Sequence, residues 1–106
     1  MIYLDFWFEW GTLSPFWRVG SRSASPSHID LAELSLSRSA RIECARLSHW
    51  YDTSLNWEYP PHPGPWTPDE AERFGEAASI LLQVVRRDLG TGYEVRDRQT
   101  AGPETR

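Results

Sequence analysis

The first ten residues of the chain alternate between two kinds of side chain. One set of alternate positions is almost wholly apolar: Ile2, Leu4, Phe6, Phe8 and Trp10. The positions between them carry the other set: Tyr3, Asp5, Trp7 and Glu9. Successive side chains of a β-strand point to opposite faces of a sheet. The alternation therefore predicts a strand whose first set faces a core and whose second set faces solvent.

Two amphipathic helices are predicted in the middle of the chain. Ser37 is the expected N-cap of the first helix, because an apolar stripe follows it at intervals of three and four. That stripe consists of Ala40, Cys44, Leu47, Tyr51 and Leu55. The second helix begins in "TPDEAERF", where Thr67 caps and Pro68 takes the first helical position. It ends at Gly90, a residue type suited to the left-handed conformation.

The remaining segments are shorter. "PFWRVG" can form a second strand with Pro15 at its start, since proline has no N–H to give a sheet. Residues 20–29 read as a polar loop, and Asp30 and Glu33 have capping-box spacing for a turn of helix. "YEVRDR" alternates again and predicts a final strand, and residues 99–106 carry nothing to bury.

These elements predict a two-layer α+β fold in the order β, possible short β, α, α, β. Because a helix hairpin turns back on itself, the last strand can return beside the first. We expect a sheet of two or three strands covered by the helix hairpin. The domain would span residues 1–98, and residues 99–106 would be a disordered tail.

Composition argues against several classes of protein. The 106 residues carry 11 basic and 15 acidic side chains, with a net charge of −4. A nucleic-acid-binding protein needs a basic stripe, and none is visible. The N-terminus has neither a basic leader nor the roughly 20 apolar residues of a membrane span. Cys44 is the only cysteine, so no internal disulfide can form, and we expect a cytoplasmic protein. From the charge distribution and the N-terminal composition we expect neither a nucleic-acid nor a membrane partner.

No pattern of catalytic or metal-binding residues is present. The histidines and Cys44 lack the close spacing of metal ligands, and Cys44 falls on the buried stripe, where a cysteine is usually a small apolar residue. No phosphate-binding glycine loop or nucleophile elbow occurs. The sequence therefore predicts no cofactor and no metal, and it leaves catalysis without positive support.

Exposed aromatic residues are the strongest functional signal. On the outer face of the sheet, Asp5 and Glu9 could pair with Arg96 and Arg98, beside Tyr3 and Trp7. The second candidate is "NWEYPPHPGPW", which carries Trp57, Tyr59 and His62 between the two helices. Aromatic and arginine residues dominate binding hot spots. This loop also reads as a structural joint, because Trp66 precedes the cap Thr67, from which a hydrophobic staple packs.

The order of motifs resembles a group of small uncharacterised actinobacterial proteins. The shared features are "SPFW", "LSLS", "HWYDTSLN", "WTPDEAERF" and "RRDLGTGYEV", which together span Ser14 to Val95. The chain departs from that group at Ala78, where glycine is usual. The group has no established activity. Some small proteins of this general appearance accompany bacterial toxins as immunity factors.

We therefore expect a protein-binding module with an immunity-like or regulatory role. The alternative is a small enzyme or ligand-binding protein with a pocket between sheet and helices. One end of that pocket would be lined by Cys44, His49, Tyr51 and Asp52. A third alternative is a homodimer formed through an unpaired sheet edge.

Overall fold

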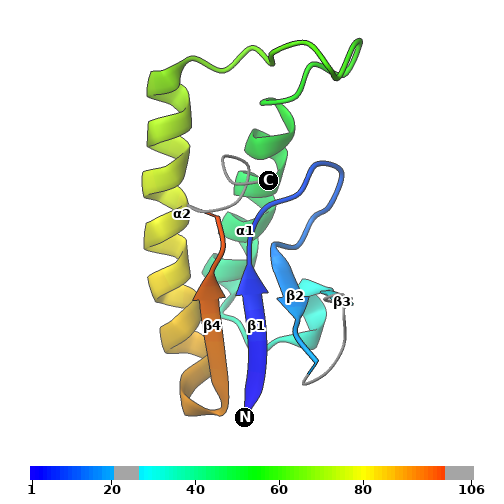
Figure 1. The fold of residues 1–106 in the computed structure, drawn as a ribbon. Coiled ribbons are helices and arrows are strands. Elements are labelled where there is room, and N and C mark those ends of the chain that lie inside the picture. Colours follow the sequence, from blue (N-terminus) through cyan, green and yellow to red (C-terminus); the bar gives the residue numbers. More distant parts are fainter. Residues whose placement is uncertain (21–26, 100–106) are drawn as a thin grey trace.

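The computed structural model describes residues 1–20 and 27–99 (Figure 1). Four short strands form one sheet: β1 (Ile2–Phe6), β2 (Phe16–Arg18), β3 (Ser27–Ile29) and β4 (Tyr93–Asp97). Two helices form the second layer: α1 (Arg38–Asp52) and α2 (Pro68–Leu89). Single turns of 3-10 helix, η1 (Leu31–Glu33) and η2 (Gly90–Gly92), precede α1 and β4. The two-layer α+β prediction is confirmed at the level of fold class.

The sheet has the strand order β3-β2-β1-β4. β1 pairs with β2 in antiparallel and with β4 in parallel orientation, and Leu4 lies opposite Val95. The first and last strands thus lie side by side, as the helix hairpin predicted. The expected number of strands was too low, because Ser27–Ile29 pairs with β2 within the predicted polar loop 20–29. A three-residue polar strand shows no alternation of its own, and residues 21–26 lie outside the described part of the chain.

β1 ends at Phe6, earlier than the alternation through Trp10 predicted. The next position of the ladder places Trp7 opposite Pro15, and only one of the two usual hydrogen bonds forms there. The N–H of Trp7 donates to the carbonyl of Pro15 at 2.9 Å. Pro15 has no N–H to return, so the carbonyl of Trp7 accepts from the indole N–H of Trp17 at 3.2 Å. The regular strand stops where proline interrupts the ladder.

Both helices begin as their caps predict. The Ser37 hydroxyl accepts a hydrogen bond from the N–H of Ala40 at 3.2 Å, and the Thr67 hydroxyl accepts from Glu70 at the same distance. Gly90 ends α2 with a φ of +75°, in the region that favours glycine. The capping box before η1 is also present, because Glu33 accepts from the N–H of Asp30 at 3.1 Å.

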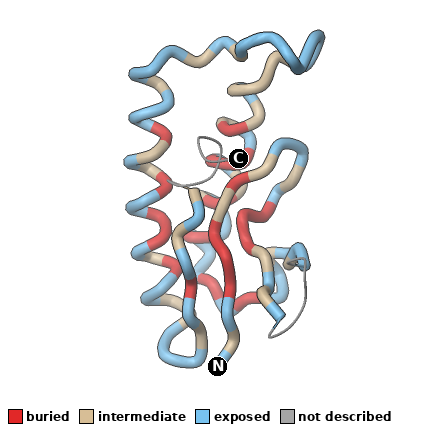
Figure 2. Tube along the Cα trace, in the orientation of Figure 1, coloured by how far each residue is buried: buried red, intermediate tan, exposed pale blue. Residues whose placement is uncertain are grey.

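The core lies between one face of the sheet and the two helices, as the red segments of Figure 2 show. The strands contribute Leu4, Phe6, Phe16 and Val95. The helices contribute the predicted stripes: Ala40, Cys44, Leu47 and Tyr51 from α1, and Phe74, Ala78, Leu81 and Val85 from α2. Burying each large apolar side chain stabilises the fold by about 1.5–3 kcal/mol. Neither helix of the described residues lies on the opposite face of the sheet (Figure 1).

The predicted tail begins at Gln99, whose side chain is partly buried. Its amide oxygen accepts a hydrogen bond from the backbone N–H of Phe8 at 2.7 Å. The rest of the predicted tail, residues 100–106, lies outside the described part of the chain. The proposed domain boundary at residue 98 therefore stays a prediction.

Candidate protein-binding surface

The uncovered face of the sheet brings four side chains into one row, one from each strand. The register places Trp17 opposite Asp5, Asp5 opposite Arg96, and His28 opposite Trp17. Residues opposite each other in neighbouring strands present their side chains to the same face. The row therefore reads His28, Trp17, Asp5 and Arg96 across β3, β2, β1 and β4.

Asp5 and Arg96 form the ion pair that the alternation predicted. The Nε of Arg96 donates to Oδ1 of Asp5 at 2.8 Å. Asp5 is 6% exposed, however, so the expectation of a solvent-facing acid was wrong. Its neighbours on this face are Trp17 and Arg96, two large side chains that limit the access of water. Arg96 is the outer member of the pair, and its side chain is 48% exposed.

The second predicted pair, Glu9 with Arg98, falls beyond the end of β1. The carbonyl of Glu9 starts a turn, accepting from the N–H and the hydroxyl of Thr12 at 3.3 and 2.9 Å. The backbone N–H of Arg98 donates to the carbonyl of Phe6 at 3.0 Å and extends the parallel ladder, while its side chain is exposed. Arg98 therefore lies next to the row His28–Trp17–Asp5–Arg96, just past the end of β4. Glu9 lies in the connection between β1 and β2 and is not part of the sheet.

Aromatic rings continue the surface on the β2 side. The rings of Trp7 and Trp17 meet edge to face with centroids 5.9 Å apart. Trp17 also contacts His28, with ring centroids at 4.8 Å, and Nε2 of His28 lies 2.9 Å from the carbonyl oxygen of Ser14. Tyr3, on the same face of β1, is 46% exposed. The predicted residues Tyr3 and Trp7 thus lie in one surface with the pair Asp5–Arg96.

Sequence reasoning missed Trp17 and His28. The alternation of "PFWRV" places Trp17 on the face of the sheet opposite to the buried Phe16. That pattern could have identified Trp17 as a surface residue. Nothing in the sequence pointed to His28, because its place on this face depends on the pairing of β3 with β2.

The proline loop lies at the far end of the helices, away from the strands (Figure 1). Trp57 is 58% exposed, although its indole N–H donates to the carbonyl of Asp52 at 2.7 Å. Tyr59 is also exposed and meets His62 edge to face at 4.3 Å between ring centroids. The predicted residues Trp57, Tyr59 and His62 therefore form a second surface, separate from the sheet face.

Trp66 packs against both helices at their joint, as the prediction of a structural joint requires. Its ring lies 5.1 Å from Phe74 and 5.8 Å from Trp50, and its N–H donates to the hydroxyl of Thr53 at 2.7 Å. The N–H of Trp50 in turn donates to Glu70, near the start of α2, at 2.9 Å. These contacts join the end of α1 to the beginning of α2.

The residues of the alternative pocket do not come together. Cys44 is fully buried in the core, and burial raises the pKa of its thiol to about 12. His49 is exposed, while Tyr51 packs against Phe8 and Phe74. The carboxylate of Asp52 accepts from the backbone N–H of Gly11 at 2.9 Å. A thiol with so high a pKa stays protonated near neutral pH and is a poor nucleophile.

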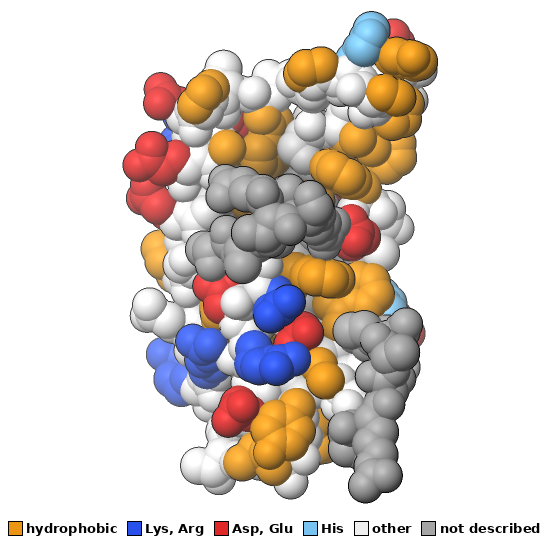
Figure 3. Space-filling view, in the orientation of Figure 1, with side chains coloured by type: hydrophobic (Ala, Val, Ile, Leu, Met, Phe, Trp, Pro, Cys, Tyr) orange, Lys and Arg blue, Asp and Glu red, His pale blue; other side chains and the backbone are white. Residues whose placement is uncertain are grey.

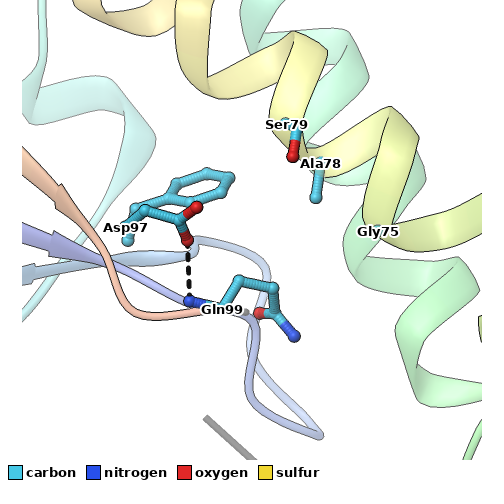
Figure 4. A pocket seen from close by; sticks show the side chains of 6 residues that line it. Gly75, Ala78, Ser79, Asp97 and Gln99 are labelled. Atoms are coloured by element: carbon cyan, nitrogen blue, oxygen red, sulfur yellow. Dashed lines mark hydrogen bonds between the residues drawn. The ribbon is translucent and has the colours of Figure 1, made fainter. Parts of the chain in front are cut away.

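A narrow crevice separates α2 from the end of β4 (Figure 4). It is lined by Phe6, Gly75, Ala78, Ser79, Asp97 and Gln99, and it is too narrow to admit a water molecule. The carboxylate of Asp97 is engaged there by the backbone N–H of Gln99 at 2.9 Å, the dashed line of Figure 4. This crevice does not bind a ligand as it stands.

The two outer strands, β3 and β4, leave sheet edges. On β4, the guanidinium of Arg86 donates to the carbonyl of Val95 from Nε at 3.1 Å and from Nη2 at 2.6 Å. One backbone acceptor that a second copy would use is therefore already occupied. The homodimer through a sheet edge stays a prediction.

Within residues 1–20 and 27–99, no three or more histidine, cysteine or acidic side chains are grouped so that they could hold a metal ion. Neither helix of the described structure has the length and apolar character needed to cross a membrane.

Comparison with known proteins identifies a family. Residues 4–98 match the model of a family described as Serratia CdiI immunity protein-like. No significant match was found among curated proteins. The match covers all four strands and both helices except for the first two residues of β1. The chain therefore belongs to the Serratia CdiI immunity protein-like family.

Proposed function

We propose that this protein is an immunity protein that binds a protein toxin and neutralises it. The observation that carries the proposal is the family match over residues 4–98, which spans nearly the whole described fold. An immunity protein needs a stable scaffold and an exposed surface, and it needs no catalytic group. The buried thiol of Cys44 and the uncovered sheet face are compatible with that requirement.

The surface that we assign to the toxin is the outer sheet face, made of Tyr3, Asp5, Trp7, Trp17, His28, Arg96 and Arg98. Tryptophan, tyrosine and arginine are the residues that most often carry the binding energy of protein interfaces. This face also consists of backbone already held in a sheet, so binding orders few additional residues. The proline loop with Trp57, Tyr59 and His62 is the second candidate contact.

A stoichiometric titration tests the proposal. The probe is a purified toxin domain, found by testing the products of the genes adjacent to this one for toxicity, and the readout is its toxic activity at increasing amounts of this protein. A neutralising binder reduces the activity linearly to zero near one equivalent. Co-expression in a bacterial host should likewise restore growth, and a toxin of unrelated sequence serves as the control.

Two results would overturn the proposal. Unchanged toxin activity at a several-fold excess of this protein would exclude neutralisation. Complete inactivation at a small fraction of one equivalent would show that the protein acts catalytically on the toxin, which is the enzyme alternative.

A further inference from the structure

We propose that Arg96 is the centre of the toxin-binding surface and that it receives a carboxylate from an acidic segment of the toxin. This inference rests on the proposed function and specifies the chemistry of the partner.

The first step concerns the free charge of the sheet face. Asp5, the acid that the sequence placed there, is buried and bound by Arg96. Arg96 and Arg98 are both exposed on this face, and the exposed Arg86 lies beside them because it bonds the carbonyl of Val95. Figure 3 shows arginine side chains gathered over β4 and the neighbouring part of α2. The exposed Glu94 shares this face two positions before Arg96, so charges of both signs lie along β4, and Arg96 and Arg98 are the exposed cations among them.

The second step is the geometry of Arg96. Its Nε donates to Oδ1 of Asp5 at 2.8 Å. Among the residues that the structure describes, its two terminal amino groups have no hydrogen-bond partner. A guanidinium with both terminal groups available can bind a carboxylate through two parallel hydrogen bonds. Asp5 therefore orients Arg96, and the two terminal amino groups of Arg96 face solvent, where a carboxylate can bind them.

The third step is the cost of binding. A long arginine side chain normally loses rotamer freedom when it is fixed in an interface. The bond to Asp5 has already restricted this side chain, so less freedom remains to be lost. Asp5 is a positioning residue in this scheme, and Arg96 makes the contact.

The fourth step is the surrounding aromatic surface. Trp17 lies across Asp5 from Arg96 in the row, its ring contacts Trp7, and the exposed Tyr3 lies on the same face. Apolar contacts around a charged pair exclude water and strengthen its hydrogen bonds. The fitting partner segment thus carries an aspartate or glutamate flanked by apolar side chains.

Calorimetric titration of the same purified toxin domain tests this inference, with toxic activity measured in parallel. Arg96→Ala should weaken binding about 100-fold, because it removes one member of a desolvated charge pair. Arg96→Lys should weaken it about tenfold, since a point charge cannot form both parallel bonds. Asp5→Asn should weaken it about fivefold through lost orientation of Arg96.

The control is Arg41→Ala, an exposed arginine on α1, on the other side of the sheet. It removes the same charge and should leave the affinity within about twofold. Because Arg96→Ala leaves the buried Asp5 without its ion-pair partner, thermal unfolding of each variant checks that it folds. In the Arg96→Ala background, Asp5→Asn should have no further effect on affinity, which a merely structural role of Asp5 would not predict.

Three outcomes would overturn the inference. If the wild type neutralises the toxin but Arg96→Ala binds within about twofold of it, the toxin uses another surface and only this inference fails. If affinity rises when Arg96 is removed, the contacted surface of the toxin is basic. If light scattering shows a dimer that Arg96→Ala dissociates, a second copy of this chain occupies the face. A wild type that neither binds nor neutralises the toxin removes the proposed function as well.

Discussion

Replacing Phe74 by alanine removes the ring at the centre of the aromatic cluster that joins the two helices. Four rings surround it with centroid distances between 5.1 and 5.5 Å: Trp66, Phe8, Trp50 and Tyr51. Phe74 itself is 3% exposed. Truncation of a buried phenylalanine to alanine costs about 3–5 kcal/mol, and more where the neighbours cannot collapse into the space.

The neighbours of Phe74 are poorly able to collapse. The indoles of Trp50 and Trp66 are held by hydrogen bonds to Glu70 and Thr53, so they cannot move without losing those bonds. We therefore expect a loss of about 4 kcal/mol, a large part of the roughly 5–15 kcal/mol that stabilises a domain. The melting temperature should fall by about 15 °C or more.

Urea unfolding followed by tryptophan fluorescence measures the effect. The matched control is Ile80→Ala on the same helix, where the side chain is 65% exposed and the change should stay within about 0.5 kcal/mol. A loss below about 1.5 kcal/mol for Phe74→Ala, with an unchanged dependence on urea, would refute the view that this cluster holds the joint together.

Three further predictions concern single residues elsewhere in the chain. Ser37→Ala should cost about 1 kcal/mol at neutral pH, because the N-cap of α1 is lost. The hydroxyl and backbone N–H of Ser37 also donate hydrogen bonds to the carboxylate of Asp88 and lower its pKa. These bonds stabilise the folded protein fully only at pH values above the pKa that Asp88 has in the unfolded chain. This stabilisation is lost as the pH falls through the pKa of Asp88 in the folded protein. When stability is measured against pH, Ser37→Ala should therefore lose less free energy of unfolding on acidification than the wild type. Gly64→Ala should destabilise the joint, since its Cβ would overlap the carbonyl oxygen of Ser54; an unchanged melting temperature would contradict this packing. Cys44 should resist a thiol reagent at pH 8 in the folded protein and react fully in urea, because its pKa of about 12 reflects burial; rapid labelling of the folded protein would contradict it.

The helices and their caps were predictable because their signals are local. Ser37 and Thr67 each bond a backbone N–H three residues later, and the apolar stripes repeat every three or four residues. Gly90 ends α2 for an equally local reason, its positive φ. In the same way, alternation in β1 identified Leu4 and Phe6 as core residues before any partner strand was known.

The candidate surface was predictable only in part. Alternation placed Asp5 and Arg96 on one face, and the structure pairs them. It could not show that Asp5 is buried, because that depends on the side chains that the neighbouring strands place beside it. It could not show His28 on this face either, since a three-residue strand carries no periodicity of its own.

By itself, the sequence determined the kind of each long element, because side chains within a few residues of one another decide helix and strand. The tertiary structure decided which strands pair. Strand pairing in turn decides which charged side chains lie next to one another on the exposed face of the sheet. Asp5 and Arg96 are 91 positions apart, and their bond exists only because the helix hairpin returns β4 to the side of β1. Such a long-range contact depends on the closure of the whole chain, which no local pattern encodes.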